Sequence, residues 1–371
     1  MPRTLAAVVE APGAAFALQE IQLDEPHPNE VLVRMVAAGL CHTDLTVQAG
    51  HLPFALPGVL GHEGAGVVER VGSDVTRVRP GDHVVLSFTS CGRCSHCRAG
   101  HPAYCATWIP ANIFNDGVRT DGTHPLSRAG QPIGGRFFGQ SSFSAHALAD
   151  ERSVVRVDDD MPLELLAPLG CGIQTGAGTV LNVLKPSPGS SLAILGVGAV
   201  GLAALMAAAL SPLGTVVAVD RVESRLALAK ELGATHTVNG ATDDVSAVLP
   251  EITGEAGLDY AIDTTANMTV LRSAIDALGT LGTCAVVGAA PMGTELRVDV
   301  TDILAGKKIV GVTEGDADPE TLIPLLTGLY RQGRLPLDKL VRQYSIADIN
   351  TAAADVHHGE TIKPVLLFDH A

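Results

Sequence analysis

Hydrophobic and polar positions follow one pattern in about the first 90 residues and another from about residue 160 onwards. At the start, short apolar runs of β type alternate with turn residues such as Gly72-Ser73-Asp74 and Arg79-Pro80-Gly81-Asp82. These runs cover residues 31–36, 64–71 and 83–87. The pattern predicts a small, partly closed, β-rich structure.

From about residue 160, helical stretches alternate with apolar runs, which is typical of a parallel sheet with helices on both faces. These runs include residues 216–219, 260–263 and 284–288. Further on, the pattern predicts an amphipathic helix at 320–332 and a strand at 363–368 that returns to the first domain. Residues 91–145 are dense in Gly, Pro, Cys and Ser and predict loops. The expected fold class is α/β, a β-rich domain plus a doubly wound parallel sheet.

Residues 192–220 show the most regular part of this pattern. An apolar run is followed by a glycine-rich turn, an alanine-rich helix and a second apolar run. Gly196, Gly198 and Gly201 give G-x-G-x-x-G at the change from strand to helix, where a tight turn, a pyrophosphate and close packing each require glycine. Asp220 closes the second strand, where a carboxylate binds the ribose hydroxyls of NAD and repels the 2′-phosphate of NADP.

The alternative interpretation of this region is a transmembrane helix. Residues 192–210 form an uncharged stretch of 19 residues, close to the length that spans a bilayer. The three glycines at its start, the Ser211-Pro212-Leu213-Gly214 break after it and the absence of a basic flank favour the strand and helix.

Composition narrows the class of protein further. With 371 residues, 46% hydrophobic and 18% charged, the chain suits a large-cored soluble protein of two domains. Its net charge of −15 argues against nucleic acid or an anionic membrane as a partner. The first 20 residues show no signal-peptide pattern, so we expect a cytoplasmic location.

Four of the seven cysteines form the most specific motif in the chain. Cys91, Cys94, Cys97 and Cys105 have a spacing that closes a tetrahedral zinc site and leaves no position for a substrate, which makes the site structural. A disulfide framework is the alternative, but it fits neither the short spacings nor a reducing compartment. His96 and His101 lie inside this lobe and are interpreted as surface residues.

The spacing of Cys41, His62 and Cys171 is too wide to unite them, and an isolated cysteine or histidine is more often a core residue or a hydrogen-bonded bystander. Their motifs nevertheless resemble those of the zinc-dependent medium-chain alcohol dehydrogenases over nearly the whole chain. These motifs are GLCHTD (39–44), GHEGAGVV (61–68), the four-cysteine lobe, GCGIQTGAG (170–178), GVGAVG (196–201) and GETIKP (359–364). PLGCGIQTGAG and residues 121–146 are most similar to the benzyl (aryl) alcohol dehydrogenase branch.

The resemblance implies a GroES-like catalytic domain at 1–172 and 313–371, interrupted by a Rossmann NAD-binding domain at 173–312. It implies two zinc ions per chain, one structural in the lobe at about 91–105 and one catalytic on Cys41, His62 and Cys171. It also implies NAD as cofactor and a homodimer or homotetramer built through the edges of the Rossmann sheets.

Roles for single residues follow from the same resemblance. Thr43 would accept the alcohol proton, Asp44 would orient His62, and Glu63 would lie behind the zinc, unless it is only a buried structural partner. The expected NAD contacts are His42, Thr175, Gly196, Gly198, Val200, Gly201, Asp220, Arg225, Val287 and Lys363. The expected substrate pocket consists of Leu52, Trp108, Phe137, Phe138, Ala289 and Val312, for which core packing is an equal alternative.

One position departs from the family pattern. Thr46 stands where many members have a histidine that completes a proton relay, so the proton would leave by water or through a group such as His51. The expected reaction is reversible, NAD-dependent oxidation of primary aromatic or allylic alcohols. Alternatives are a terpene (geraniol-type) alcohol dehydrogenase, a thiol-adduct formaldehyde dehydrogenase and a non-catalytic NAD-binding protein. The cysteine lobe argues against a zinc-free quinone reductase.

Overall fold

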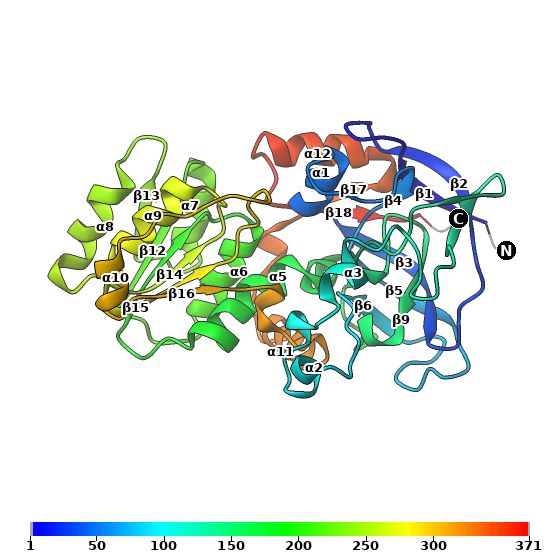
Figure 1. Cartoon of the computed structure of the whole chain (residues 1–371), viewed down its shortest axis with the longest axis horizontal. Coiled ribbons are helices and arrows are strands. Elements are labelled where there is room, and N and C mark those ends of the chain that lie inside the picture. The colour runs from blue at the N-terminus through cyan, green and yellow to red at the C-terminus, as the bar shows by residue number, and fades with distance from the viewer. Residues whose placement is uncertain (1–2, 370–371) are drawn as a thin grey trace. The chain divides into compact units, whose positions relative to one another are not determined.

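The computed structural model describes residues 3–369, and its contacts divide the chain into two compact units. The first unit contains the residues up to Cys171 and those from Asp318 onwards, and the second contains Gly172–Ala317. Figure 1 shows that the first unit is rich in strands and that the second alternates strands with helices.

The first unit is built on two sheets. One has the strand order β4-β1-β2-β7-β8, and the other has β10-β6-β5-β3-β18-β17, with β9 also paired to β3. The strands are β1 (Arg3–Val9), β2 (Ala17–Leu23), β3 (Glu30–Gly39), β4 (Gly58–Val59), β5 (Glu63–Val71), β6 (His83–Leu86), β7 (Leu126–Arg128), β8 (Gln131–Ile133), β9 (His146–Asp150), β10 (Val154–Val157), β17 (Val341–Ser345) and β18 (Lys363–Leu367).

Helices of the first unit are short, apart from two that follow the second unit in sequence. They are α1 (His42–Gln48), α2 (Ser95–Arg98), α3 (Trp108–Asn112), α4 (Leu163–Leu166), α11 (Pro319–Arg331) and α12 (Ile349–His357). The predicted helix at 320–332 is confirmed as α11, which begins at a proline after the capping side chain of Asp318. The predicted closing strand is confirmed as β18, which runs antiparallel to β3.

The second unit is one parallel sheet of six strands in the order β13-β12-β11-β14-β15-β16. Its strands are β11 (Ser191–Leu195), β12 (Thr215–Asp220), β13 (His236–Asn239), β14 (Leu258–Asp263), β15 (Leu278–Val286) and β16 (Lys308–Gly311). Its helices are α5 (Gly172–Gly178), α6 (Ala199–Ala208), α7 (Glu223–Glu231), α8 (Val245–Thr253), α9 (Met268–Asp276) and α10 (Val300–Leu304). The predicted Rossmann sheet is confirmed.

Alternate residues of β11 show why helices cover both faces of this sheet. Ala193 and Leu195 belong to a buried cluster with Leu249 of α8 and Leu271 of α9. Ile194 points to the other face, where its side chain approaches Gly201 of α6. Successive strand residues point to opposite faces, so a fully apolar strand requires a helix on each side.

Two predicted boundaries differ from the structure. The strand expected at 31–36 continues to Gly39 as β3, because β5 and β18 pair with residues 37–39. The run at 284–288 ends as a strand at Val286, since the N–H groups of Val287 and Gly288 turn back to the carbonyl of Asp263. Residues 192–210 divide between β11 and α6, and no helix within residues 3–369 is long and apolar enough to cross a membrane.

Candidate functional site

Four potential metal ligands meet in the first unit. One ligand atom each from Cys41, His62, Glu63 and Cys171 lies within 4.8 Å of the others. Cys41 is the N-terminal cap of α1, His62 directly precedes β5, and Cys171 follows a short 3-10 turn. The fold therefore brings together residues that are far apart in sequence.

The Asp44 carboxylate orients this group. Its Oδ1 accepts hydrogen bonds from the Nδ1 atom of His62 (3.1 Å) and the backbone N–H of Gly61 (3.0 Å), and its Oδ2 accepts from the N–H of Cys41 (2.9 Å). Although burial opposes the shift, the Asp44 carboxylate and the Cys41 thiol raise the pKa of the His62 imidazole, so a metal ion at Nε2 would have to displace a proton. That Nε2 atom is buried and has no hydrogen-bond partner among the described residues.

Glu63 and Lys363 form a buried ion pair beside this group. The Nζ atom of Lys363 lies 2.9 and 2.8 Å from the two carboxylate oxygens of Glu63, and both side chains are almost wholly buried. A Cβ atom on Gly39 would lie 2.0 Å from the Oε2 atom of Glu63, so this position requires glycine. The expected contact of Lys363 with NAD stays a prediction, and in this structure its ammonium bonds to the Glu63 carboxylate.

The donor set fits a zinc ion. A hydrogen bond from the Cys171 thiol, opposed by burial and reinforced by the charge of Lys363, holds the pKa of the Cys41 thiol well below its ordinary value. Thiolate is the form that binds metal, and zinc prefers sulfur and imidazole nitrogen in tetrahedral sites. The Nε2 atom of His62, which has no hydrogen-bond partner among the described residues, could supply the nitrogen.

Aromatic rings surround His62. The ring of Phe138 stacks on its imidazole with centroids 4.4 Å apart, and the ring of Phe137 meets it edge-on at 5.4 Å. Trp108 packs edge-on against Phe138 at 5.7 Å, and Leu52 lies half-buried against the same hydrophobic core. Ala289 and Val312, the other expected pocket residues, lie in the second unit, the first exposed and the second buried.

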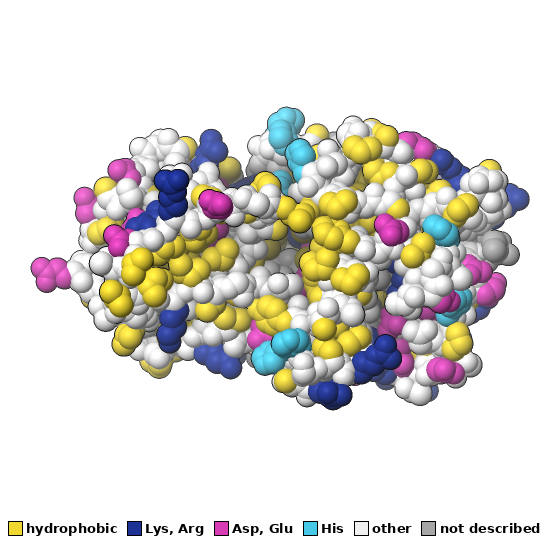
Figure 2. Space-filling view, viewed as in Figure 1, with side chains coloured by type: hydrophobic (Ala, Val, Ile, Leu, Met, Phe, Trp, Pro, Cys, Tyr) yellow, Lys and Arg dark blue, Asp and Glu magenta, His cyan; other side chains and the backbone are white. Residues whose placement is uncertain are grey.

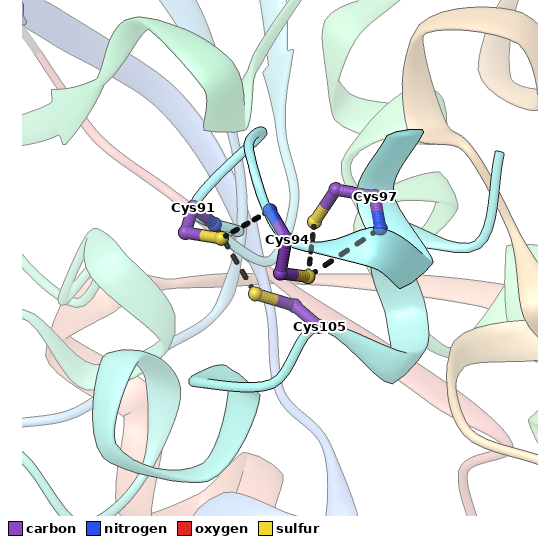
Figure 3. A group of neighbouring side chains, drawn as sticks. All are labelled: Cys91, Cys94, Cys97 and Cys105. Atoms are coloured by element: carbon purple, nitrogen blue, oxygen red, sulfur yellow. Dashed lines mark hydrogen bonds between the residues drawn. The ribbon is translucent and has the colours of Figure 1, made fainter. Parts of the chain in front are cut away.

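Cys91, Cys94, Cys97 and Cys105 form a second metal-ligand group, with all four sulfur atoms within 4.8 Å (Figure 3). Backbone N–H groups point at these sulfurs, for example from Cys94 to Cys91 (3.4 Å) and from Cys91 to Cys105 (3.3 Å). Bonds from the N–H groups of Ala106 and Cys97 lower the pKa of the Cys94 thiol to about 6. His96 and His101 are exposed, as predicted.

The glycine turn of the second unit has the geometry predicted for a dinucleotide site. Gly196 has a φ of 85°, and a Cβ on Gly201 would lie 1.9 Å from the carbonyl oxygen of Gly196. Gly198 caps α6, and a Cβ there would meet nothing within 4 Å. This open backbone at a helix N-terminus suits the close approach of a phosphate. Asp220 Oδ2 accepts from the Val197 N–H at 2.8 Å and lies 3.9 Å from the Arg225 guanidinium.

The remaining predicted residues are distributed over both units. Thr43 lies near Cys41, whose thiol donates to its hydroxyl oxygen over 3.8 Å. The Thr46 hydroxyl donates to the carbonyl of His42, and His42 and His51 are exposed. In the second unit, Thr175 is buried in α5, Val200 is half-buried in α6, and the N–H of Val287 is bonded to the carbonyl of Asp263.

Two features of the first unit could not be found from the sequence. Gln140 is buried beside the start of β5 and the end of β6, and no motif marks it. Arg119 and Arg136 both bind the buried carboxylate of Glu30, with Arg136 at 2.6 Å. These partners lie 89 and 106 residues from Glu30, so no local spacing indicates them.

Comparison with protein families gives two matches. Residues 27–159 match the family described as alcohol dehydrogenase GroES-like domain, and residues 199–328 match the family described as zinc-binding dehydrogenase. A geraniol dehydrogenase of Castellaniella defragrans is 44% identical over 365 residues, covering 98% of this chain and 97% of the relative.

Solved structures agree with these matches. The structure titled alcohol dehydrogenase zinc-binding domain protein, from Burkholderia ambifaria, is 50% identical with a TM-score of 0.96. The benzyl alcohol dehydrogenase of Acinetobacter calcoaceticus is 47% identical with a TM-score of 0.95. In both comparisons, 100% of each chain is covered.

Proposed function

Because the chain belongs to the zinc-dependent medium-chain alcohol dehydrogenase family, we propose that it oxidises primary aromatic or allylic alcohols to aldehydes, reversibly, with NAD as hydride acceptor. Similarity to a benzyl alcohol dehydrogenase and to a geraniol dehydrogenase supports this substrate class, since both names denote alcohols with unsaturation next to the hydroxyl-bearing carbon.

The observation that carries the proposal is the ligand group of Cys41, His62 and Cys171. Glu63 is the fourth member of the cluster, but Lys363 already neutralises its carboxylate. Three protein ligands leave one position of a tetrahedral zinc open, as in catalytic sites, whereas the four cysteines of the lobe would close theirs. We therefore assign one catalytic and one structural zinc to each chain.

The local charges suit an alcohol substrate. Two thiolates on the catalytic zinc offset its charge, and Lys363 offsets Glu63. When bound, zinc acts as a Lewis acid that lowers the pKa of an alcohol, and NAD takes up the hydride. Thr43 is the side chain we assign to receive the alcohol proton, because its hydroxyl lies beside Cys41.

The proton then has to leave without a histidine at position 46. The Thr46 hydroxyl is bonded to the carbonyl of His42 within its own helix, so it offers no onward donor. We assign the onward transfer to water. His51 is exposed on the loop after α1 and remains the side-chain alternative.

NAD is assigned to the glycine turn of the second unit. The N-terminus of α6 would bind the pyrophosphate, and Asp220 with Arg225 would bind the adenosine ribose. Thr175, Val200 and Val287 are the proposed contacts to the nicotinamide, and His42 is a proposed contact to the pyrophosphate.

The test is a comparison of kcat/KM for benzyl alcohol, geraniol and ethanol with NAD, on protein of known zinc content. A large preference for benzyl alcohol over ethanol supports the aryl assignment, and a preference for geraniol supports the terpene alternative. Activity only with formaldehyde and a thiol would indicate that the protein is a thiol-adduct formaldehyde dehydrogenase. No turnover of any alcohol at two zinc ions per chain would contradict the proposal and favour a non-catalytic NAD-binding protein.

We also assign a second copy of this chain as partner, through the edge strand β16. Large apolar side chains are exposed beside this edge, and Figure 2 shows hydrophobic side chains gathered around β15, β16 and α10. They are Leu281 (69% exposed), Val300 (71%), Ile303 (50%) and Leu304 (80%). Such a patch with an unpaired strand edge is typical of a subunit interface. Leu304→Glu should therefore shift the molecular mass in solution towards the monomer.

A further inference from the structure

The segment from Arg136 to Ser141 has a strained backbone. The φ angles of Arg136, Phe138 and Ser141 are 63°, 50° and 52°, in the left-handed region that non-glycine residues rarely adopt. A residue in this conformation is strained and persists only where the surrounding structure fixes it. The segment therefore has to be held in place from several sides.

Three sets of bonds hold it. The Arg136 guanidinium bonds to the buried Glu30 carboxylate at 2.6 Å, and the Asn115 amide donates to the carbonyl of Arg136 at 2.9 Å. The Ser141 hydroxyl donates to the carbonyl of Val59 at 2.6 Å and accepts from the N–H of Phe137 at 2.9 Å. Both ends of the segment are thus fixed to the body of the first unit.

Besides the rings of Phe137 and Phe138, this strained segment presents the side chain of Gln140, which is 2% exposed, to the metal-ligand group. Its Nε2 donates to the carbonyl of His62 at 2.9 Å, and its Oε1 accepts from the N–H of Gly64 at 3.1 Å. One amide therefore binds the backbone on both sides of Glu63, where β5 begins.

The same amide reaches the segment that carries the third ligand. Its Nε2 also donates to the carbonyl of Ser87 at 3.1 Å, and the Ser87 hydroxyl donates to the carbonyl of Gly170 at 2.7 Å. Gly170 directly precedes Cys171. A chain of hydrogen bonds therefore runs from the backbone of His62 through Gln140 and Ser87 to the residue beside Cys171.

We infer that Gln140 is a positioning residue that holds His62 and Cys171 at the separation a metal ion requires. Asp44 fixes the His62 ring at Nδ1, and Phe138 covers the face of that ring. Within the part of the chain that the structure describes, Gln140 bonds directly to the His62 backbone and, through Ser87, to the turn before Cys171. This inference rests on the proposed function, in which both residues ligate the catalytic zinc.

The distinguishing variant is Gln140→Met, which keeps the length of the side chain and removes all three hydrogen bonds. A second variant, Gln140→Glu, keeps an acceptor for the Gly64 N–H and loses the two bonds to carbonyls. Loss of a group that supports a metal ligand costs about 10–100-fold in metal affinity. We expect Gln140→Met to weaken zinc binding at the Cys41 site by this factor, and Gln140→Glu to weaken it in the same direction.

Two measurements separate positioning from general destabilisation. Chelator competition follows the two zinc sites of one protein, and the cysteine lobe should retain its zinc. The visible spectrum of Co²⁺ at the Cys41 site reports ligand geometry and should change in both variants. Asn350→Leu is the matched control, since the Asn350 amide makes a similar pair of bonds to the N–H (3.0 Å) and carbonyl (2.9 Å) of Phe16.

The outcomes are distinct. Unchanged affinity and an unchanged Co²⁺ spectrum in either folded variant would overturn the role of Gln140 and leave the proposed function intact. The same loss of zinc affinity in Asn350→Leu would also overturn it, because the loss would then follow from removing any buried pair of amide–backbone hydrogen bonds. If the unsubstituted protein binds only the lobe zinc, and Cys171→Ala leaves its metal content unchanged, the proposed function itself fails.

Discussion

The Nδ1 atom of His62 lies 3.1 Å from the Oδ1 atom of Asp44, and both side chains are completely buried. The same carboxylate accepts the N–H groups of Cys41 and Gly61. Asp44 therefore receives three donors and links the segments of two proposed metal ligands. A group with only acceptor atoms suits this position.

Asp44→Asn should weaken zinc binding at the Cys41 site by about 10–100-fold. An amide has one acceptor oxygen, so its NH₂ group would face at least one of the three N–H donors. Zinc affinity measured by chelator competition tests this. Asp299→Asn is the control, because Asp299 caps α10 at the surface and should leave zinc affinity unchanged.

Cys97→Ser should lower the zinc content by one ion per chain and lower the melting temperature. A closed four-cysteine site contributes its metal-binding free energy to folding. Metal analysis and thermal unfolding measure the two effects. Cys284→Ala provides the comparison, since Cys284 is buried in the second unit outside both ligand groups. A variant at position 97 that kept both ions would remove this cysteine from the structural site.

Asp220→Asn should reduce the preference for NAD over NADP by about tenfold or more, because the charge that repels a 2′-phosphate is lost. Asparagine has one acceptor oxygen for the three backbone N–H groups that Asp220 accepts, from Val197, Arg221 and Val222, so the variant is judged by the ratio of the two cofactors and not by its rate with one of them. The ratio of kcat/KM for the two cofactors is the measurement. An unchanged ratio would assign ribose recognition to another residue. Asp259→Asn, at an exposed acid in β14, serves as the control.

Glu30→Gln should destabilise the first unit by about 3–5 kcal/mol, because it leaves the buried guanidinium groups of Arg119 and Arg136 without their shared carboxylate. Chemical unfolding measures the change. Glu20→Gln breaks the exposed pair with Arg3, whose side chains are 62% and 69% exposed, and should change stability by less than about 1 kcal/mol. Equal effects of the two substitutions would contradict a special role for the buried cluster.

Asp263→Asn should make the second unit less sensitive to pH. Burial raises the pKa of the Asp263 carboxyl, although bonds from Thr265 oppose the shift. An acid with a raised pKa in the folded state stabilises that state below the unfolded pKa of about 3.9, and this contribution is lost as the pH rises through the folded pKa. Between pH 3.5 and 7 the free energy of unfolding should therefore fall less with rising pH in the variant than in the unsubstituted protein. The same pH dependence of the free energy of unfolding in both proteins would contradict this prediction.

Features that depend on neighbours in sequence could be predicted. The glycine turn, the strand that ends at Asp220 and the four-cysteine lobe are each contained in short segments, and α11 shows a helical apolar period. The grouping of Cys41, His62 and Cys171 needed the family resemblance, because the spacing of these residues carries no signal.

Features that depend on distant partners could not be predicted. Lys363 was expected to contact a cofactor, and its pairing with Glu63 joins residues 300 positions apart. Gln140 lies 78 residues from His62, in a segment whose pattern only predicted a loop. The role of a buried polar side chain depends on the groups that it bonds to, and the topology of the sheets decides which groups these are.

The position of β18 in its sheet has a consequence for protein synthesis. This strand lies between β3 and β17, and its first residue, Lys363, neutralises the Glu63 carboxylate beside the ligand group. A ribosome makes the N-terminal half of this sheet long before it reaches residue 363. The continuous second unit can fold during that interval, before Lys363 is available to bond to Glu63. We therefore expect the nascent chain to bind zinc at the Cys41 site only after residue 363 has been made, and to need a chaperone for the incomplete sheet until then.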